Sequence, residues 1–243
     1  MRQQGFGPWL RRAVLKALLA WLALTVLPVL ALRWVHPITS AFMIEAKWRA
    51  LHAGQRHYRT DYRWVAYRQI SPEVGLAAVA SEDQTFPYNH GFDFQEIDDA
   101  IHTAERGGRL RGASTITQQV AKNLFLWGGR SWVRKGIEAY LTVLIDALWP
   151  KQRVLQMYLN IAQFGHGIFG VEAASERFFH EPAAHLTRDQ AALLAAVLPD
   201  PVHWHVAYPS PFVRWRQQWL LHQMSDLGGP AYLHSHGPPH GVR

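Results

Sequence analysis

The strongest constraint on this chain is an apolar run close to its N-terminus. The 20 residues from Ala13 to Leu32 contain one charge, at Lys16, and none from Ala17 onward. An α-helix rises ~1.5 Å per residue, so a run of this length covers ~30 Å, the thickness of the hydrocarbon core of a bilayer. Lys16 lies one turn inside the run and can extend its ammonium to the headgroups. We therefore predict a transmembrane helix over residues 13–32.

The charges beside this run predict its orientation. Basic residues precede or open it at Arg2, Arg11, Arg12 and Lys16, and only Arg33 follows closely. Because basic flanks stay on the cytoplasmic side, we expect residues 1–12 in the cytoplasm and the chain beyond about residue 36 outside. A cleaved signal peptide is the alternative. Its cleavage site would be Val29-Leu30-Ala31, a poor match, and the apolar run is long, which favours an uncleaved anchor.

The rest of the chain is long enough for one helical domain. The protein has 243 residues and no Cys, which excludes disulfides, thiolate zinc sites and thiol nucleophiles. Ser71-Pro72-Glu73 is typical of a helix start, and Thr187 to Gln190 forms a capping box. No window shows sustained alternation with a period of two among β-branched residues. We predict an all-α domain over residues 71–228, with at most a short hairpin, between a membrane-proximal segment (33–70) and a flexible tail (229–243).

Charge is segregated along this domain. Residues 81–105 carry seven acids and no Lys or Arg, whereas residues 106–153 carry nine bases and two acids. Such a pattern suits proton transfer beside an anionic ligand, although solvated helix faces are the simpler explanation of charge alone. The sequence has no H-E-x-x-H, Walker loop, G-x-S-x-G or nucleic-acid-binding motif, so a nucleotide-driven or serine-hydrolase mechanism has no support.

The first candidate cluster surrounds Glu82. This residue falls where the helix that begins at Pro72 should end, with Phe86 close behind it. The negative end of a helix dipole and nearby apolar side chains both disfavour a charged carboxylate, as a general base requires. An ordinary solvated Glu is the alternative that this segment alone would favour.

The second candidate cluster runs from Gly112 to Asn123. Ser114 or Thr115 can cap the helix that follows, and free backbone N–H groups at its start would bind an anion. Because Ser114, Gln118 and Lys122 are spaced by four residues, we expect them to line one polar face. That face suits a sugar–phosphate ligand; a solvated surface explains it equally well.

The third candidate cluster is Arg134-Lys135-Gly136-Ile137-Glu138. Arg134 and Glu138 are four residues apart and can form a simple ion pair, worth ~0.3–0.5 kcal/mol. The functional alternative is a set of cations that neutralises a diphosphate. Glu138 would then orient these bases or hold a divalent cation.

Together these clusters resemble the motifs of glycosyltransferase family 51, the peptidoglycan glycosyltransferases. Three motifs match Glu82-Asp83-x-x-Phe86, Gly112 to Asn123, and Arg134-Lys135-x-x-Glu138; two more match Lys151 to Asn160 and Ala191 to Pro199. The resemblance covers roughly residues 70–225. With only a short anchor before the motifs and no second domain after them, the chain looks like a monofunctional member.

The resemblance implies a lysozyme-like, all-α domain outside the inner (cytoplasmic) membrane that polymerises lipid II into β-1,4 glycan strands. Glu82 would be the general base, and Glu138 would act with the cations on the leaving undecaprenyl diphosphate, with Mg²⁺ as a possible but not required cofactor. The implied substrate-binding residues are Asp83, Phe86, Ser114, Thr115, Gln118, Gln119, Lys122, Asn123, Arg134, Lys135 and Asn160. The implied partners are lipid II, the growing strand, membrane lipid and other wall-synthesis proteins, without nucleic acid.

The sequence also departs from the family pattern. Many members have His three residues after the Phe of the first motif, where this chain has Asn89, followed by His90. We expect Asn89 to keep a hydrogen bond and to lose any titrating role. Gln163 and Gln190 stand where acids are common. Two alternatives remain: a lysozyme-like hydrolase, which needs an acid and a second carboxylate or a participating substrate group, and a non-catalytic scaffold.

Overall fold

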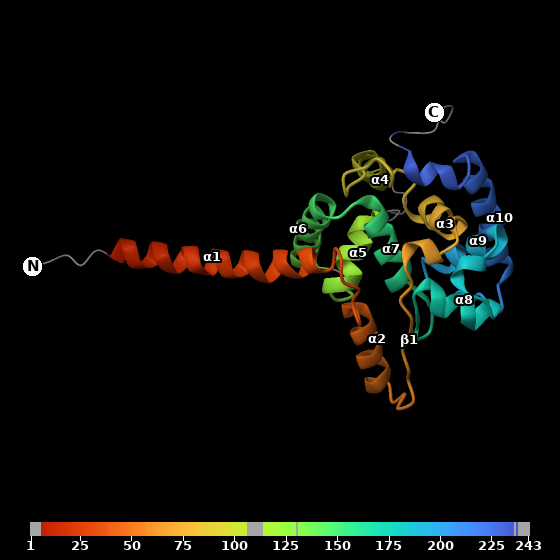
Figure 1. Cartoon of the computed structure of the whole chain (residues 1–243), viewed down its shortest axis with the longest axis horizontal. Coiled ribbons are helices and arrows are strands. Elements are labelled where there is room, and N and C mark those ends of the chain that lie inside the picture. Colours follow the sequence, from red (N-terminus) through yellow and green to blue (C-terminus); the bar gives the residue numbers. More distant parts are fainter. Residues whose placement is uncertain (1–5, 106–113, 130, 236, 238–243) are drawn as a thin grey trace, which may run out of the picture.

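The computed structural model describes residues 6–105, 114–129, 131–235 and 237, and it consists of one long helix that leads into a helical domain (Figure 1). The long helix is α1 (Phe6–Ala31). Within it, Trp9–Ala31 is apolar and long enough to cross a membrane, with a mean hydropathy of 2.2. In Figure 1 most of α1 projects away from the domain. The structure therefore contains the membrane-length helix predicted over residues 13–32.

The C-terminal end of α1 is fixed to the domain by hydrogen bonds. Trp149 Nε1 donates to the carbonyl of the buried Val29 at 2.7 Å. The Arg33 guanidinium donates to the Leu148 carbonyl at 2.6 Å, and Arg153 donates to the Leu32 carbonyl at 2.8 Å. These bonds satisfy carbonyl groups that a helix end leaves without intrahelical partners.

The core of the domain is built around two helices that are apolar on nearly all sides. They are α3 (Pro72–Glu82) and α9 (Arg188–Val197), which pack against each other and against α10 (Pro211–Asp226). The runs Val74–Ala80 and Ala191–Val197 are buried throughout, which is typical of helices enclosed by others. Many of these residues are Ala, so the helices can pack closely.

The remaining helices complete the domain around and beside this core. They are α2 (Ala41–His52), α4 (Phe94–Glu105), α5 (Ile116–Phe125), α6 (Trp132–Leu148), α7 (Lys151–Ile161) and α8 (Val171–Phe179), with short 3₁₀ helices at Tyr67–Gln69, Ala183–His185 and Pro230–His234. Helix α5 packs on both α6 and α7, and α6 also packs on α1. The prediction of a mainly helical domain is confirmed.

A small three-stranded sheet joins the membrane-proximal segment to the domain. Strands β2 (Gln163–Gly165) and β3 (Ile168–Phe169) are antiparallel, and β1 (Asp61–Tyr62) pairs with β3 in parallel. The chain turns from β3 into α8 at Gly170, whose φ is +85° and where a Cβ would lie 2.6 Å from the Asn160 carbonyl. Only glycine fits there.

Local signals in the sequence predicted two helix starts correctly. Helix α3 begins at Pro72, and Thr187 and Gln190 form the expected capping box at α9. The tail differs from expectation in its first part: Pro230–His234 forms a 3₁₀ helix instead of fraying. It packs because Tyr232 is buried and its hydroxyl donates to the Gln84 carbonyl at 2.6 Å. Residues 236 and 238–243 of that tail lie outside the described residues.

Candidate active site

Glu82 is the last residue of α3, and neutral donors hold both of its carboxylate oxygens. Gln119 of α5 donates from Nε2 to Glu82 Oε2 at 2.9 Å. Ser81 donates from Oγ to Glu82 Oε1 at 2.9 Å, and Arg216 of α10 donates to the same Ser81 Oγ at 3.0 Å. The Glu82 side chain is half-buried. It is therefore oriented by its neighbours and still reachable from solvent.

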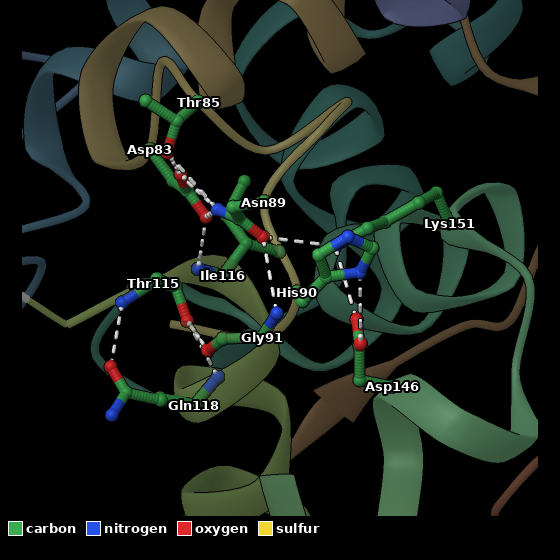
Figure 2. Close-up of polar contacts among 10 residues, drawn as sticks. All are labelled: Asp83, Thr85, Asn89, His90, Gly91, Thr115, Ile116, Gln118, Asp146 and Lys151. Carbon is green, nitrogen blue, oxygen red and sulfur yellow. Dashed lines mark hydrogen bonds and ion pairs between the residues drawn. The ribbon is translucent and has the colours of Figure 1, made fainter. Parts of the chain in front are cut away.

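Asp83, the next residue, is buried and faces the interior (Figure 2). Its carboxylate accepts hydrogen bonds from Asn89 Nδ2 at 2.9 Å, Thr85 Oγ1 at 3.1 Å and the backbone N–H of Ile116 at 3.0 Å. Burial raises the pKa of Asp83 from 3.8 to about 6, against the opposing effect of these bonds and of the Lys151 charge. The carboxylate joins the end of α3 to the start of α5.

Asn89 connects this carboxylate to α7. Besides donating to Asp83, it accepts from Lys151 Nζ at 2.9 Å and from the Gly91 N–H at 3.3 Å (Figure 2). Lys151 also lies 3.2 Å from Asp146. The expectation that Asn89 keeps a hydrogen bond is confirmed. His90 has a fully solvated position, with its side chain 94% exposed and its Nδ1 3.8 Å from Asp146, so it does not occupy the place of the usual His.

The start of α5 differs from the predicted polar face. Thr115 is the N-cap, and Gln118 forms a reciprocal capping box with it through a 3.0 Å bond from the Thr115 N–H to Gln118 Oε1. Thr115 Oγ1 also donates to the Gly91 carbonyl at 2.6 Å. Both side chains are buried. The capping bond turns Gln118 back toward the helix start, so Ser114, Gln118 and Lys122 do not form one open stripe.

The expected anion site at this helix start is occupied by the protein itself. The Ile116 N–H donates to Asp83, and the Gln118 N–H donates to Thr115 Oγ1 at 3.2 Å. A helix N-terminus attracts negative charge, and here that charge is a side-chain carboxylate rather than a ligand. Ser114 and Gln119 are half-buried beside it.

The ammonium group of Lys122 interacts with the charges of both Glu82 and Glu138. Burial lowers the pKa of Lys122, while the charges of Glu138 and Glu82 raise it and those of Arg134 and Lys135 lower it. The ammonium lies 5.4 Å from the centre of the Phe42 ring. One side chain on α5 thus connects the first and third clusters, and Asn123 is half-buried next to it.

Glu138 on α6 is buried between two cations. Its carboxylate accepts from Arg134 Nη1 at 2.5 Å and from Lys135 Nζ. Arg134 is also fixed by a 2.8 Å bond from Nε to the Gly129 carbonyl. With Lys122 nearby, three cations surround one carboxylate, and the cluster keeps a net positive charge.

This cluster does not form a metal site by itself. Both carboxylate oxygens of Glu138 already accept from cations. Among the described residues, no group of three or more His, Asp or Glu side chains could hold a metal ion. The residues therefore do not fit the Mg²⁺ that the resemblance suggested, and the chemistry below uses side chains alone.

Two predicted substrate-binding residues, Asn160 and Phe86, have buried side chains. Asn160 is fully buried, and its amide binds the backbone of Val65 through bonds of 2.8 and 3.1 Å. Phe86 is buried in the core, with Lys151 Nζ 5.0 Å from its ring centre. Burial of both side chains argues against direct contact with a substrate.

Sequence reasoning gave no role to Lys151, Tyr158 or Arg216, although each touches the site. Tyr158 is buried, and its hydroxyl lies 3.5 Å from Gln119 Oε1. Burial, followed by the charges of Glu82 and Asp83, raises its pKa well above the usual value, which keeps the hydroxyl neutral. Lys151 and Tyr158 are seven residues apart on one face of α7 and fall within the matched motif Lys151 to Asn160, and both signals could have paired them with the site.

A half-buried carboxylate with oriented oxygens and a cluster of cations around Glu138, in a helical domain that follows a membrane-length helix, are typical of the class of membrane-associated enzymes. Comparison with known proteins narrows this class. Residues 50–225 match the protein family described as Transglycosylase, and the chain belongs to that family. The family predicted from the motifs is thereby confirmed.

Relatives match nearly the whole chain. A biosynthetic peptidoglycan transglycosylase of Cronobacter sakazakii is 50% identical over 93% of this chain and 94% of its own length. A protein of the same name from Xylella fastidiosa (strain M12) is 48% identical over 94% of this chain and 93% of its own length. Another from Shigella boydii serotype 4 is 54% identical over 85% of this chain and 86% of its own length. Both findings support the expected peptidoglycan glycosyltransferase class.

Proposed function

We propose that this chain is a membrane-anchored peptidoglycan glycosyltransferase that polymerises lipid II into β-1,4 glycan strands and releases undecaprenyl diphosphate. The observation that carries the proposal is that α5 connects the two ends of the site: Gln119 donates to Glu82 at 2.9 Å, and Lys122, three residues further on, interacts with the charge of Glu138. A proton acceptor and a diphosphate-binding cluster thereby belong to one site. The names of the relatives support the same substrate.

In this mechanism Glu82 takes the proton of the acceptor's 4-hydroxyl. The oxygen attacks the anomeric carbon of the growing chain, and the bond from that carbon to the diphosphate oxygen breaks with inversion. Ser81 and Gln119 orient the carboxylate through the two 2.9 Å bonds. A base held in one orientation next to the hydroxyl lowers the entropic part of the barrier.

The leaving diphosphate is stabilised by Lys122, Arg134 and Lys135. Charge develops on its oxygens as the bond breaks, and preorganised cations stabilise that charge most strongly away from water. Glu138 acts as a positioning residue, because its carboxylate holds Arg134 and Lys135 side by side.

The other predicted site residues form two groups, one with half-buried and one with buried side chains. We assign substrate contacts to Ser114, Gln119 and Asn123, which are half-buried near Glu82 or Lys122. Supporting roles fall to the buried set: Asp83, Phe86, Thr115, Gln118 and Asn160. These side chains set the relative positions of α3, α5 and α7.

In this proposal the anchor holds the site at a membrane surface. With the basic flank in the cytoplasm, the domain lies on the periplasmic side, where a lipid-linked sugar can enter from the membrane. Contacts with other wall-synthesis proteins remain a prediction from the family resemblance.

The hydrolase alternative needs either a second carboxylate or a participating substrate group, and the first of these two routes is disfavoured. Asp83 is the carboxylate adjacent to Glu82, but it is buried and bound by Asn89, Thr85 and Ile116. Hydrolysis also gives no role to the cations around Glu138. The scaffold alternative gives no reason for the two bonds that orient Glu82.

The test is incubation of the purified full chain with labelled lipid II, followed by separation of polymer from small products. We expect long glycan strands and free undecaprenyl diphosphate. Disaccharide fragments would support the hydrolase, and unchanged substrate would support the scaffold; either result contradicts the proposal.

A further inference from the structure

The membrane-proximal helix α2 contacts the cationic cluster from outside the helices that carry it. It packs on α5, and the Lys122 ammonium lies 5.4 Å from the centre of the Phe42 ring. Glu45 follows Phe42 by three residues and therefore lies on the same side of α2. Its carboxylate accepts a hydrogen bond from the Gly128 N–H at 2.6 Å. One side of α2 thus contacts both a cation and the turn between α5 and α6.

This turn contains two glycines in succession, Gly128 and Gly129. Gly129 has a φ of +94°, which few other residues adopt. Because glycine has the most backbone freedom to lose on folding, such a turn keeps one shape only if neighbouring groups hold it. The Glu45 carboxylate is such a group: a Cβ on Gly128 would lie 3.0 and 3.2 Å from its two oxygens, so the carboxylate packs directly on the backbone.

The same turn holds the guanidinium of Arg134. The Gly129 carbonyl accepts from Arg134 Nε at 2.8 Å, and Arg134 Nη1 donates to Glu138 at 2.5 Å. The orientation of the guanidinium therefore depends on the turn as well as on the glutamate. A continuous connection runs from Glu45 through the backbone of the two glycines to a cation of the site.

We propose that Glu45 is a positioning residue for the leaving-group end of the site: it fixes the turn, and the turn fixes the Arg134 guanidinium. The proposal rests on the proposed function, because it concerns stabilisation of the leaving diphosphate. Arg49 binds the other carboxylate oxygen of Glu45, but its side chain is 62% exposed, and exposed ion pairs contribute little. The effect of Glu45 therefore comes from its bond to the Gly128 N–H.

The first test compares three substitutions of Glu45 in the full chain. Glu45→Ala removes the acceptor, and we expect kcat/KM for lipid II and the affinity for undecaprenyl diphosphate each to fall about tenfold, because a misplaced cation stabilises the diphosphate less. Glu45→Gln keeps an acceptor oxygen for the Gly128 N–H and should stay within about twofold of the original chain. Glu45→Asp keeps the charge but withdraws it by one methylene, so it should resemble Glu45→Ala.

Lys47→Ala is the matched control on the same helix. Lys47 is exposed, and two residues along a helix correspond to about 200° of rotation, so it lies on the opposite side from Glu45. This variant should change neither the turnover nor the affinity.

A second measurement separates positioning from general stability. Arg134→Lys keeps the positive charge but has one nitrogen, which cannot replace the two guanidinium nitrogens that bind the Gly129 carbonyl and Glu138. In that background Glu45→Ala should lower kcat/KM by less than about twofold, because both substitutions interrupt the same connection. A residue that only stabilises the fold would cause an equal loss in both backgrounds. Glu45→Asp takes the place of Glu45→Ala in this comparison if the Ala variant does not fold.

Three results would overturn the inference: full activity of both Glu45→Ala and Glu45→Asp, a loss in Glu45→Gln as large as that in Glu45→Ala, or an equal loss in the Arg134→Lys background. Binding of undecaprenyl diphosphate needs no turnover. A chain in which this affinity depends on Glu45 through Arg134, but which makes no polymer, would therefore contradict the proposed function alone.

Discussion

The two ends of the site are built from different interactions. At the end of α3, Glu82 is held by neutral donors, Ser81 and Gln119, and remains half-buried. At the start of α6, Glu138 is buried and held by charged donors, Arg134 and Lys135. Neutral donors orient a carboxylate without neutralising it, so it can still accept a proton. Charged donors neutralise the carboxylate and leave a surplus of positive charge for an anion. The same residue type therefore serves two functions.

The largest expected effect comes from removing the proton acceptor. Glu82→Gln keeps the size and polarity of the side chain but cannot accept a proton at neutral pH. We expect kcat to fall by about 10³-fold, within the range for general base catalysis, with an unchanged melting temperature. Polymerisation of lipid II by the purified variant measures this. Glu176→Gln, on α8, is the control and should retain activity; near-normal turnover by Glu82→Gln would disprove the assignment.

A somewhat smaller effect is expected at the cationic end. Lys122→Ala removes the side chain that connects the two glutamates, and we expect kcat/KM to fall by about 10²-fold, because a charge that stabilises the leaving diphosphate is lost. Binding of undecaprenyl diphosphate should weaken in parallel. If affinity and turnover both stay at the original level, Lys122 is a structural residue and the two ends of the site are independent.

Loss of the Asn89 side chain should affect stability more than chemistry. Asn89→Ala removes one of the donors to the buried Asp83 and one of the acceptors of Lys151, so the free energy of unfolding should fall by about 1–3 kcal/mol. Urea unfolding measures the change. Asn89→His should recover part of it, if an imidazole can replace one of the two bonds. A variant as stable as the original would show that the network around Asp83 contributes little.

The smallest effect is a pH dependence of stability that originates at Asp83. Its pKa is raised from 3.8 to about 6 in the folded chain, so folding favours the protonated form. The resulting stabilisation is complete below about pH 4 and is lost as the pH rises through 6. Thermal unfolding between pH 4 and 7 should show this fall, and Asp83→Asn should flatten it. An identical slope in the variant would assign the dependence to another group.

Most of the fold could be predicted from local signals. The apolar run predicted α1, the Ser-Pro-Glu start predicted α3, and the capping box predicted α9. The packed tail could not be predicted, because Gly, Pro and His favour irregular backbone. Burial of Tyr232 and its hydrogen bond to the Gln84 carbonyl give that segment a reason to order.

The site could be predicted less completely. Spacing alone suggested that Gln118 faces the ligand and that the start of α5 binds an anion. In the structure a capping box uses the Gln118 side chain, and the Asp83 carboxylate takes the anion's place. Helical periodicity tells which residues share a face, but it does not tell which neighbouring element covers that face. For the same reason Asn160 belonged to a motif and yet serves to bind Val65.

The amino-acid sequence by itself determined the anchor, the helical class, the family and the candidate base, because each depends on residues close together in the chain. Only the tertiary structure decided which polar side chains remain open, which bind other parts of the fold, and that the charge of Lys122 interacts with two glutamates 56 positions apart in sequence. The physical reason is burial: whether a polar group binds a substrate or another part of the protein depends on the segments that pack over it.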